Sequence, residues 1–126
     1  MILIIGGAYQ GKLEYALDRF NLTEDDVFFC KDEETAMPLD KKIVCNFDLW
    51  ILALLREGRD VHGMARQFIE NNGGAIVICN DISGGVVPVD ALFRKWRESL
   101  GRLTTEMAQQ SDEVIRLFCG IATQLK

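Results

Sequence analysis

The residues best suited to chemistry lie near the start of the chain, in a glycine-rich stretch that ends in a lysine. Gly6, Gly11 and Lys12 have the spacing G-x-x-x-x-G-K, which is the pattern of a phosphate-binding P-loop. The glycines let backbone N–H groups turn onto a phosphate, the helix that follows directs its positive end there, and the lysine reaches the terminal phosphates. The pattern therefore predicts a nucleotide site formed by Gly6, Gly7, Ala8, Tyr9, Gln10, Gly11, Lys12 and Leu13.

Leu13 is the part of this stretch that does not fit the pattern. A P-loop has Ser or Thr at this position, and its hydroxyl binds Mg²⁺. A leucine side chain cannot ligate a hard cation, which takes oxygen ligands. We therefore expect ATP or GTP as the ligand, while the sequence predicts no metal ligands and leaves the binding of Mg²⁺ in doubt.

A second candidate stretch follows the apolar run 75–79 and reads N-D-I-S-G-G-V-V-P from Asn80 to Pro88. It brings an acid, Asp81, a hydroxyl and two glycines to the end of a central strand, which is where open α/β sheets place their ligands. Asp81 is therefore a candidate catalytic residue together with Lys12. The alternative interpretation is a plain connecting loop.

The histidine and the cysteines do not indicate a catalytic or metal site. The single histidine, His62, falls in the helix after Gly58, and a histidine on a helix face is the simpler interpretation. The four cysteines have no C-x-x-C spacing, so they predict neither a zinc ribbon nor a thioredoxin-type site. Each lies at or near the end of a predicted strand, and core packing is favoured over a metal or redox role. They are Cys30, Cys45, Cys79 and Cys119.

Apolar runs and helical periodicity predict the elements that must position these residues. Strands are expected at 2–5, 27–30, 43–45, 75–79 and 113–119, and helices at 13–20, 47–56, 60–71 and 90–110. The residues from 31 to 42 are expected to be a loop and those from 120 to 126 a tail. On the last helix, a stripe of five large side chains is predicted to face the core: Phe93, Trp96, Leu100, Leu103 and Met107.

Strands that alternate with helices at short spacing predict a mostly parallel sheet with helices on both faces. The expected fold is a P-loop NTPase-like, three-layer α/β domain with a five-stranded sheet. It is expected to occupy residues 1–126 as a single nucleotide-binding-like domain, because a chain of 126 residues, 48% of them hydrophobic, is long enough to bury one core.

Charge and hydropathy narrow the class of partner. The formal charge is −5 and the pI is near 4.8, which disfavours a nucleic-acid-binding surface. No apolar run is long enough to span a bilayer, and the N-terminus lacks the features of a secretory signal. We therefore expect a cytoplasmic protein with no nucleic-acid or membrane partner.

Several segments, in order, resemble motifs of one enzyme family. The opening, G-G-A-Y-Q-G-K-L, is similar to its G-G-A-R-S-G-K-S. Residues 80–88 match N-E-V-G-x-G-I-V-P, and residues 43–50, I-V-C-N-F-D-L-W, fall on L-V-D-C-L-T-L-W. Residues 94–97, 101–103 and 108–114 then follow its R-x-F-R, G-R-x-N-Q and A-x-x-A-D-x-V. The family is that of the bifunctional adenosylcobinamide kinase/adenosylcobinamide-phosphate guanylyltransferases, and the resemblance covers nearly the whole chain except residues 25–42.

Departures from the family pattern limit what the resemblance implies. Leu13 replaces the Mg²⁺-binding Ser, Cys45 replaces the Asp that ends the third strand, and Gln10 replaces the usual Ser of the loop. Asp81 stands for a Glu and Thr104 for an Asn. The segment that carries the guanylyl-accepting histidine, expected between the second and third strands, is missing, so the resemblance implies that guanylylation is absent.

Two classes of function remain open from the sequence. The first is a transferase like the family, with ATP or GTP at Gly6 to Lys12 and phosphoryl transfer to a cobinamide-like or other alcohol. In that case Asp81 or Asp48 would have to help hold Mg²⁺. The second is a non-catalytic relative with a regulatory or assembly role, and reduced or absent kinase activity is favoured because the metal positions are substituted. The resemblance also implies a homo-oligomer, such as a trimer.

Overall fold

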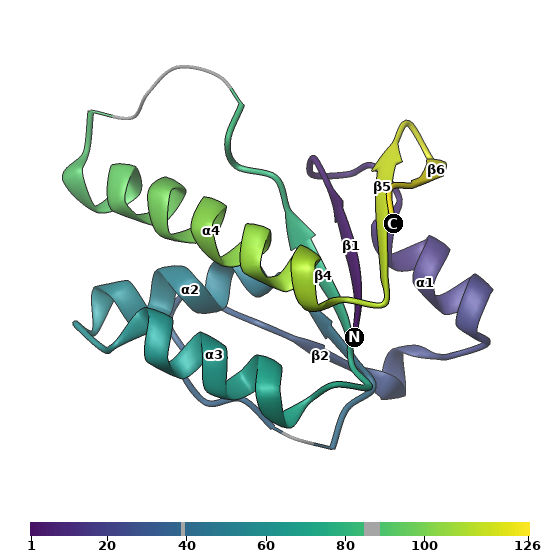
Figure 1. Cartoon of the computed structure of the whole chain (residues 1–126), viewed down its shortest axis with the longest axis horizontal. Helices are drawn as coiled ribbons and strands as arrows, with labels where there is room; N and C mark the ends of the chain where they lie inside the picture. Colours follow the sequence, from purple (N-terminus) through teal and green to yellow (C-terminus); the bar gives the residue numbers. More distant parts are fainter. Residues whose placement is uncertain (39, 85–88) are drawn as a thin grey trace.

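The structure is a computed structural model that describes residues 1–38, 40–84 and 89–126, and it forms an α/β fold (Figure 1). The strands are β1 Ile2–Gly6, β2 Val27–Phe29, β3 Ile43–Cys45, β4 Ile76–Asn80, β5 Glu113–Phe118 and β6 Ile121–Gln124. The helices are α1 Lys12–Phe20, α2 Phe47–Arg56, α3 Val61–Asn71 and α4 Ala91–Gln110, with a short 3₁₀ helix at Glu24–Asp26. The sheet order is β2-β3-β4-β1-β5-β6. All neighbouring strands pair in parallel except β5 and β6, which are antiparallel.

The two faces of the sheet bury separate hydrophobic cores. Helix α1 covers one face, where Ala16 packs against β1, β3 and β4 residues such as Ile4, Ile43 and Ile78. Helices α2, α3 and α4 cover the other face, where Phe47 and Leu103 pack among Leu3 and Val77. Strands β1 and β4 are neighbours, yet the helices that follow them lie on opposite faces (Figure 1). Open α/β sheets place their ligands at such a point, beyond the carboxyl ends of the strands.

The fold class is as predicted, but the sheet has a sixth strand. Residues 121–124, expected to be part of a tail, form β6 against β5. Cys119 and Gly120 are the two residues of the turn between them, with φ angles of 51° and 75°. A two-residue hairpin turn with positive φ at both positions matches the twist of the strands. Cysteine at the first of these positions gives no turn signal, so the sequence did not predict the hairpin.

The stripe on α4 is only partly buried. Leu100, Leu103 and Met107 lie in the core, but Phe93 is exposed and Trp96 is half-buried. The prediction for Phe93 was wrong because the first turns of α4 lie away from the strands (Figure 1), beyond the sheet that would cover them.

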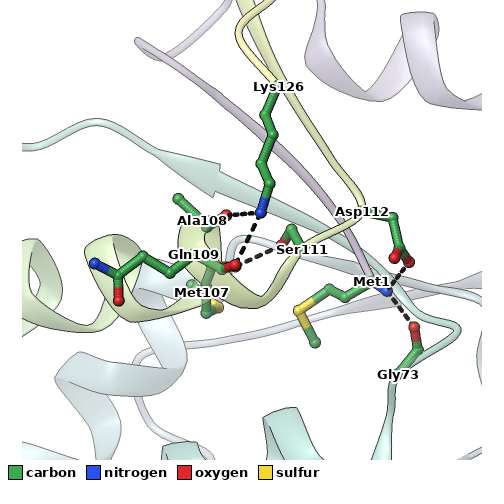
Figure 2. A network of polar contacts seen from close by, with 8 residues as sticks. All are labelled: Met1, Gly73, Met107, Ala108, Gln109, Ser111, Asp112 and Lys126. Atoms are coloured by element: carbon green, nitrogen blue, oxygen red, sulfur yellow. Dashed lines mark hydrogen bonds and ion pairs between the residues drawn. The ribbon is translucent and has the colours of Figure 1, made fainter.

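Both ends of the described chain are tied to the same edge of the fold (Figure 2). The amino group of Met1 donates to the Gly73 carbonyl and pairs with Asp112 at 3.1 Å. At the end of α4, Lys126 Nζ donates to the carbonyls of Ala108 and Gln109 at 3.2 and 2.8 Å. A lysine at a helix C-terminus satisfies carbonyls that have no partner within the helix and complements the negative end of its dipole.

Some predicted segments fall partly outside the described residues. Leu39 belongs to the predicted loop 31–42, and Gly85, Val86, Val87 and Pro88 belong to the second candidate stretch; these five lie outside the described residues. Within the part of the chain that the structure describes, no helix has the length and apolar character needed to cross a membrane.

Gly6 is the point of closest approach between β1 and β5. A Cβ atom placed on Gly6 would lie 2.5 Å from the carbonyl oxygen of Leu117, whereas one on Gly7 would meet only the Gln10 side chain at 3.7 Å. The first contact is with backbone and cannot be relieved by a side-chain rotation. Gly6 is therefore required where the central strand passes into the loop.

We predict that Gly6→Ala lowers the free energy of unfolding by about 2 kcal/mol or more, as overpacking against a fixed atom does. Gly7→Ala is the matched control and should change it by less than about 0.5 kcal/mol. Urea unfolding of the two variants and the wild type measures the difference. Equal midpoints for the two variants would contradict this account of Gly6.

Candidate functional site

The predicted phosphate loop runs from the end of β1 to the first turn of α1, at the carboxyl edge of the sheet. Gly11 is the N-cap of α1, with a φ of 88°, and no side chain accepts a hydrogen bond from the first turn of this helix. Helix N-terminal N–H groups without such a cap can be satisfied by an anion. Tyr9, in the middle of the loop, has a φ of 60° and is fully exposed. The loop therefore contains two residues with positive φ and leads into a helix that has no side-chain cap.

Lys12 is buried beneath this loop, with only 7% of its surface exposed. Its Nζ donates to the carbonyl oxygen of Gly7 at 2.6 Å, so the ammonium points back into the loop. Burial lowers the pKa of Lys12, and the negative charge of Asp48 is the largest influence that opposes this. The lysine is thus held by the loop that precedes it.

Beside the loop is a pocket of about 380 Å³. One side of this pocket is formed by the loop and the start of α1. The other side is formed by residues at the carboxyl ends of β2, β3 and β4, namely Phe29, Cys45, Asn46 and Asn80. Leu13 also lines it, while packing against the core on the α1 face. The predicted loop residues from Ala8 to Leu13 therefore share one pocket, and its far wall is formed by residues at the carboxyl ends of β2, β3 and β4.

Gln10 links the loop to the β5–β6 hairpin. Its side-chain carbonyl accepts a hydrogen bond from the Cys119 backbone N–H, and its backbone carbonyl accepts one from Gly120 at 3.1 Å. A larger and more open pocket, of about 730 Å³, lies on this side of the loop and is lined by Tyr9, Tyr15 and Cys119 among others. The sequence did not predict these contacts, because the hairpin itself was not predicted.

Asp81 lies just beyond β4, and its backbone N–H donates to the carbonyl of Gly6 at 2.9 Å. Its carboxylate accepts hydrogen bonds from the backbone N–H and the hydroxyl of Ser83, at 2.9 and 2.5 Å, and these bonds hold its pKa below the usual range. The Arg97 side chain donates to the Ser83 carbonyl. Asp81 lines a separate pocket of about 240 Å³ against α4, and Asn80 lines both this pocket and the one beside the loop.

Asp48, unlike Asp81, is buried. It lies in the first turn of α2, is 2% exposed, and its two carboxylate oxygens accept from the backbone and side-chain N–H groups of Asn80, at 3.1 and 3.3 Å. Burial raises the pKa of Asp48, while the Asn80 hydrogen bonds oppose the shift. Trp96 Nε1 also donates to the Asp48 backbone carbonyl at 2.8 Å. The sequence placed Asp48 near the site but gave no sign of these partners.

The side chains around the loop offer few oxygen ligands to a divalent cation. The side chains of Leu13 and Cys45 carry no oxygen, and each carboxylate oxygen of Asp48 accepts a hydrogen bond from Asn80. Among the described residues, no group of three or more His, Cys, Asp or Glu side chains is arranged to hold a metal ion. The carboxylates that remain near the loop are Glu14, which lines the pocket beside it, and Asp81, which lines the separate pocket against α4.

His62 and Thr104 lie apart from the loop. His62 lines a pocket between α3 and α4 together with Lys95 and Glu98. The Thr104 hydroxyl donates to carbonyls of its own helix, at Leu100 and Gly101. Cys30, Cys45 and Cys79 are buried as predicted, but Cys119 is exposed. The prediction for Cys119 was wrong because this residue turns the hairpin rather than ending a strand inside the core.

A comparison with protein families supplies independent evidence. The family described as cobinamide kinase / cobinamide phosphate guanyltransferase matches residues 47–125, which is more than half of the chain. The chain belongs to this family. Among curated proteins, no relative matches the chain. Membership of the cobinamide kinase / cobinamide phosphate guanyltransferase family indicates a nucleotide-binding role in cobalamin biosynthesis. The matched residues begin at α2, so the phosphate loop is an observation separate from the family match.

The positions of the four thiols predict a simple labelling pattern. Burial raises the pKa of Cys30 to about 12 and that of Cys45 to about 11, and Cys79 is fully buried with its pKa also raised, whereas Cys119 is exposed. Because the thiolate is the reactive form, a thiol reagent at about pH 8 should modify one cysteine quickly and three only on unfolding. Cys119→Ser should remove the fast phase. Fast modification of a second thiol in the native protein would contradict the buried positions.

Proposed function

We propose that the protein binds the phosphates of ATP or GTP at residues Gly6 to Leu13, as a cobinamide kinase-like protein with a degenerate metal site. The observation that carries the proposal is the buried Lys12, directed by Gly7 into a loop whose following helix has no side-chain cap. A buried ammonium is costly unless it has partners, and an anion in the loop supplies one. The pocket of about 380 Å³ beside the loop gives room for a phosphate chain.

Catalysis requires more from the site than nucleotide binding does. Phosphoryl transfer depends on positioning and on neutralising the charge that develops on the phosphates, and a metal ion normally carries much of that charge. The chain keeps the backbone donors and Lys12 but supplies few oxygen ligands. Reduced or absent kinase activity follows, with a regulatory or assembly role in cobalamin biosynthesis as the alternative to catalysis. The protein would then act as a single nucleotide-binding domain, in the cytoplasm and as a homo-oligomer.

One observation favours a second candidate, a transferase with Asp81 in the catalytic role. Asp81 stays ionised, lies at the end of the strand next to β1, and faces a pocket of about 240 Å³ that meets the loop pocket at Asn80. A carboxylate there can orient the hydroxyl of an alcohol, such as a cobinamide-like acceptor, and accept its proton. A turnover assay with ATP or GTP and cobinamide, run with and without Mg²⁺, separates the two candidates: product formation that Asp81→Asn abolishes supports the transferase.

We predict that Lys12→Ala weakens the binding of ATP or GTP by about 1.5 to 3 kcal/mol, which is the value of hydrogen bonds to charged groups. Lys41→Ala is the matched control, because the Lys41 side chain donates to the Asp25 carbonyl near the amino ends of β2 and β3. Calorimetric titration measures both variants. Unchanged affinity in Lys12→Ala would reject the loop as the nucleotide site.

A further prediction concerns the dependence on Mg²⁺. Nucleotide affinity of the wild type should depend little on this ion, since Leu13 offers it no ligand. Leu13→Ser should restore part of the dependence, and adding Cys45→Asp should restore more than either change alone, because two ligands of one ion are coupled. Affinities of the four proteins with and without Mg²⁺ test this. A wild-type affinity that rises about tenfold with Mg²⁺, a coupling of about 1.4 kcal/mol, would contradict it.

A further inference from the structure

The larger pocket, of about 730 Å³, opens from the phosphate loop on the side of the β5–β6 hairpin. It shares Tyr9, Gln10, Gly11 and Glu14 with the pocket of about 380 Å³ that contains Lys12. In Figure 1 the hairpin lies on the same side of the sheet order as the start of α1. A ligand whose anionic end occupies the loop can therefore extend directly into the larger pocket.

The chemistry of the larger pocket differs from that of the loop pocket. Two tyrosines and two carboxylates line it, and no Lys or Arg is found among the described residues of its lining. Carboxylates only accept hydrogen bonds, and aromatic rings stack on other planar rings. The pocket therefore suits an uncharged ring that carries N–H donors, whereas the phosphates suit the pocket with Lys12. A nucleotide has both of these parts.

Tyr15 and Tyr9 supply the aromatic surface of this pocket. The hydroxyl of Tyr15 accepts a hydrogen bond from Arg19 at 3.1 Å, and Arg19 pairs with Glu113 of β5 at 2.7 Å, so this ring is tied to the sheet. Tyr9 is fully exposed and has a φ of 60°, which is rare for a bulky residue. Nucleic-acid bases stack on such rings, and a base in the pocket would remove apolar surface of Tyr9 from water.

Asp18 is the acceptor farthest along the pocket from the loop. It lies in the last turn of α1, where the helix dipole disfavours a negative charge. Its carboxylate is exposed, and within the described residues it accepts no hydrogen bond and joins no ion pair. It follows Lys12 by six residues, which is about 9 Å along the helix axis. A base joined through its sugar to phosphates in the loop can span such a separation.

We propose that this pocket is the nucleoside subsite of the phosphate loop and that Asp18 makes it select guanine over adenine. This inference rests on the proposed function, because the loop would hold the phosphates of the same nucleotide. Guanine presents two adjacent N–H donors, at N1 and N2, and one carboxylate can accept both hydrogen bonds. Adenine presents one donor, at N6, beside an N1 lone pair that repels a carboxylate oxygen. Asp18 is therefore a specificity-determining residue.

The test compares GDP with ADP by calorimetric titration without Mg²⁺. The wild type should bind GDP about tenfold or more tightly than ADP, because hydrogen bonds to a charged acceptor are strong. Asp18→Asn should remove or reverse this preference, since an amide can accept from N6 of adenine and donate to N1. Asp25→Asn is the matched control: it changes another exposed aspartate, which does not line the pocket, and should keep the preference. Equal wild-type affinities, or a preference for GDP that survives in Asp18→Asn, would overturn the proposal.

Titrations with the separate parts of the nucleotide, followed by NMR, distinguish this inference from the proposed function. Pyrophosphate tests the loop alone, and guanosine against adenosine tests the nucleoside subsite alone. If pyrophosphate binds through Lys12 while guanosine binds no better than adenosine, the proposed function stands and the subsite is wrong. If pyrophosphate does not bind but guanosine is preferred in the wild type and not in Asp18→Asn, the phosphate loop is wrong and the subsite stands.

Discussion

The site depends on the burial of one positive charge. A lysine ammonium that is removed from water must be compensated, and the cost grows with the degree of burial. In this protein the Gly7 carbonyl accepts from Lys12, and the negative charge of Asp48 opposes the lowering of the Lys12 pKa by burial. Asn80 and Trp96 in turn hold Asp48, which brings β4 and α4 into the same arrangement. The phosphate loop is therefore built from four elements of the fold rather than from its own residues alone.

The order of the strands in the sheet decides which residues lie beside the loop. Strand β1 lies between β4 and β5, so the loop that follows it has neighbours on both sides. On the β4 side are Asn80 and the pocket beside Lys12; on the β5 side are Cys119 and Gly120, which bond to Gln10. Gly6 allows β1 to approach the Leu117 carbonyl closely enough for the second set of contacts to form.

The sequence predicted what is encoded locally. The apolar runs gave β1 and β4, the cap Asp60 gave the start of α3, and the G-x-x-x-x-G-K spacing located the loop. It did not predict β6, because the turn at Cys119 lacks the residues that usually adopt positive φ. Nor did it predict the bonds of Asp48, because Asn80 and Trp96 are separated from it by 32 and 48 positions and meet it only through packing. Residues that act through such distant contacts leave no periodic signal.

The substitution of Gln10 for the usual Ser of the family can now be explained by the fold. The Gln10 amide is long enough to reach the backbone of Cys119, and the neighbouring Gly120 N–H binds the Gln10 carbonyl. A serine hydroxyl at this position is two bonds shorter in reach and would leave the Cys119 N–H without that acceptor. The loop thereby gains support from the hairpin, in addition to the hydrogen bond that Lys12 donates to Gly7. These contacts join the loop to the hairpin at a distance of more than a hundred positions in the sequence.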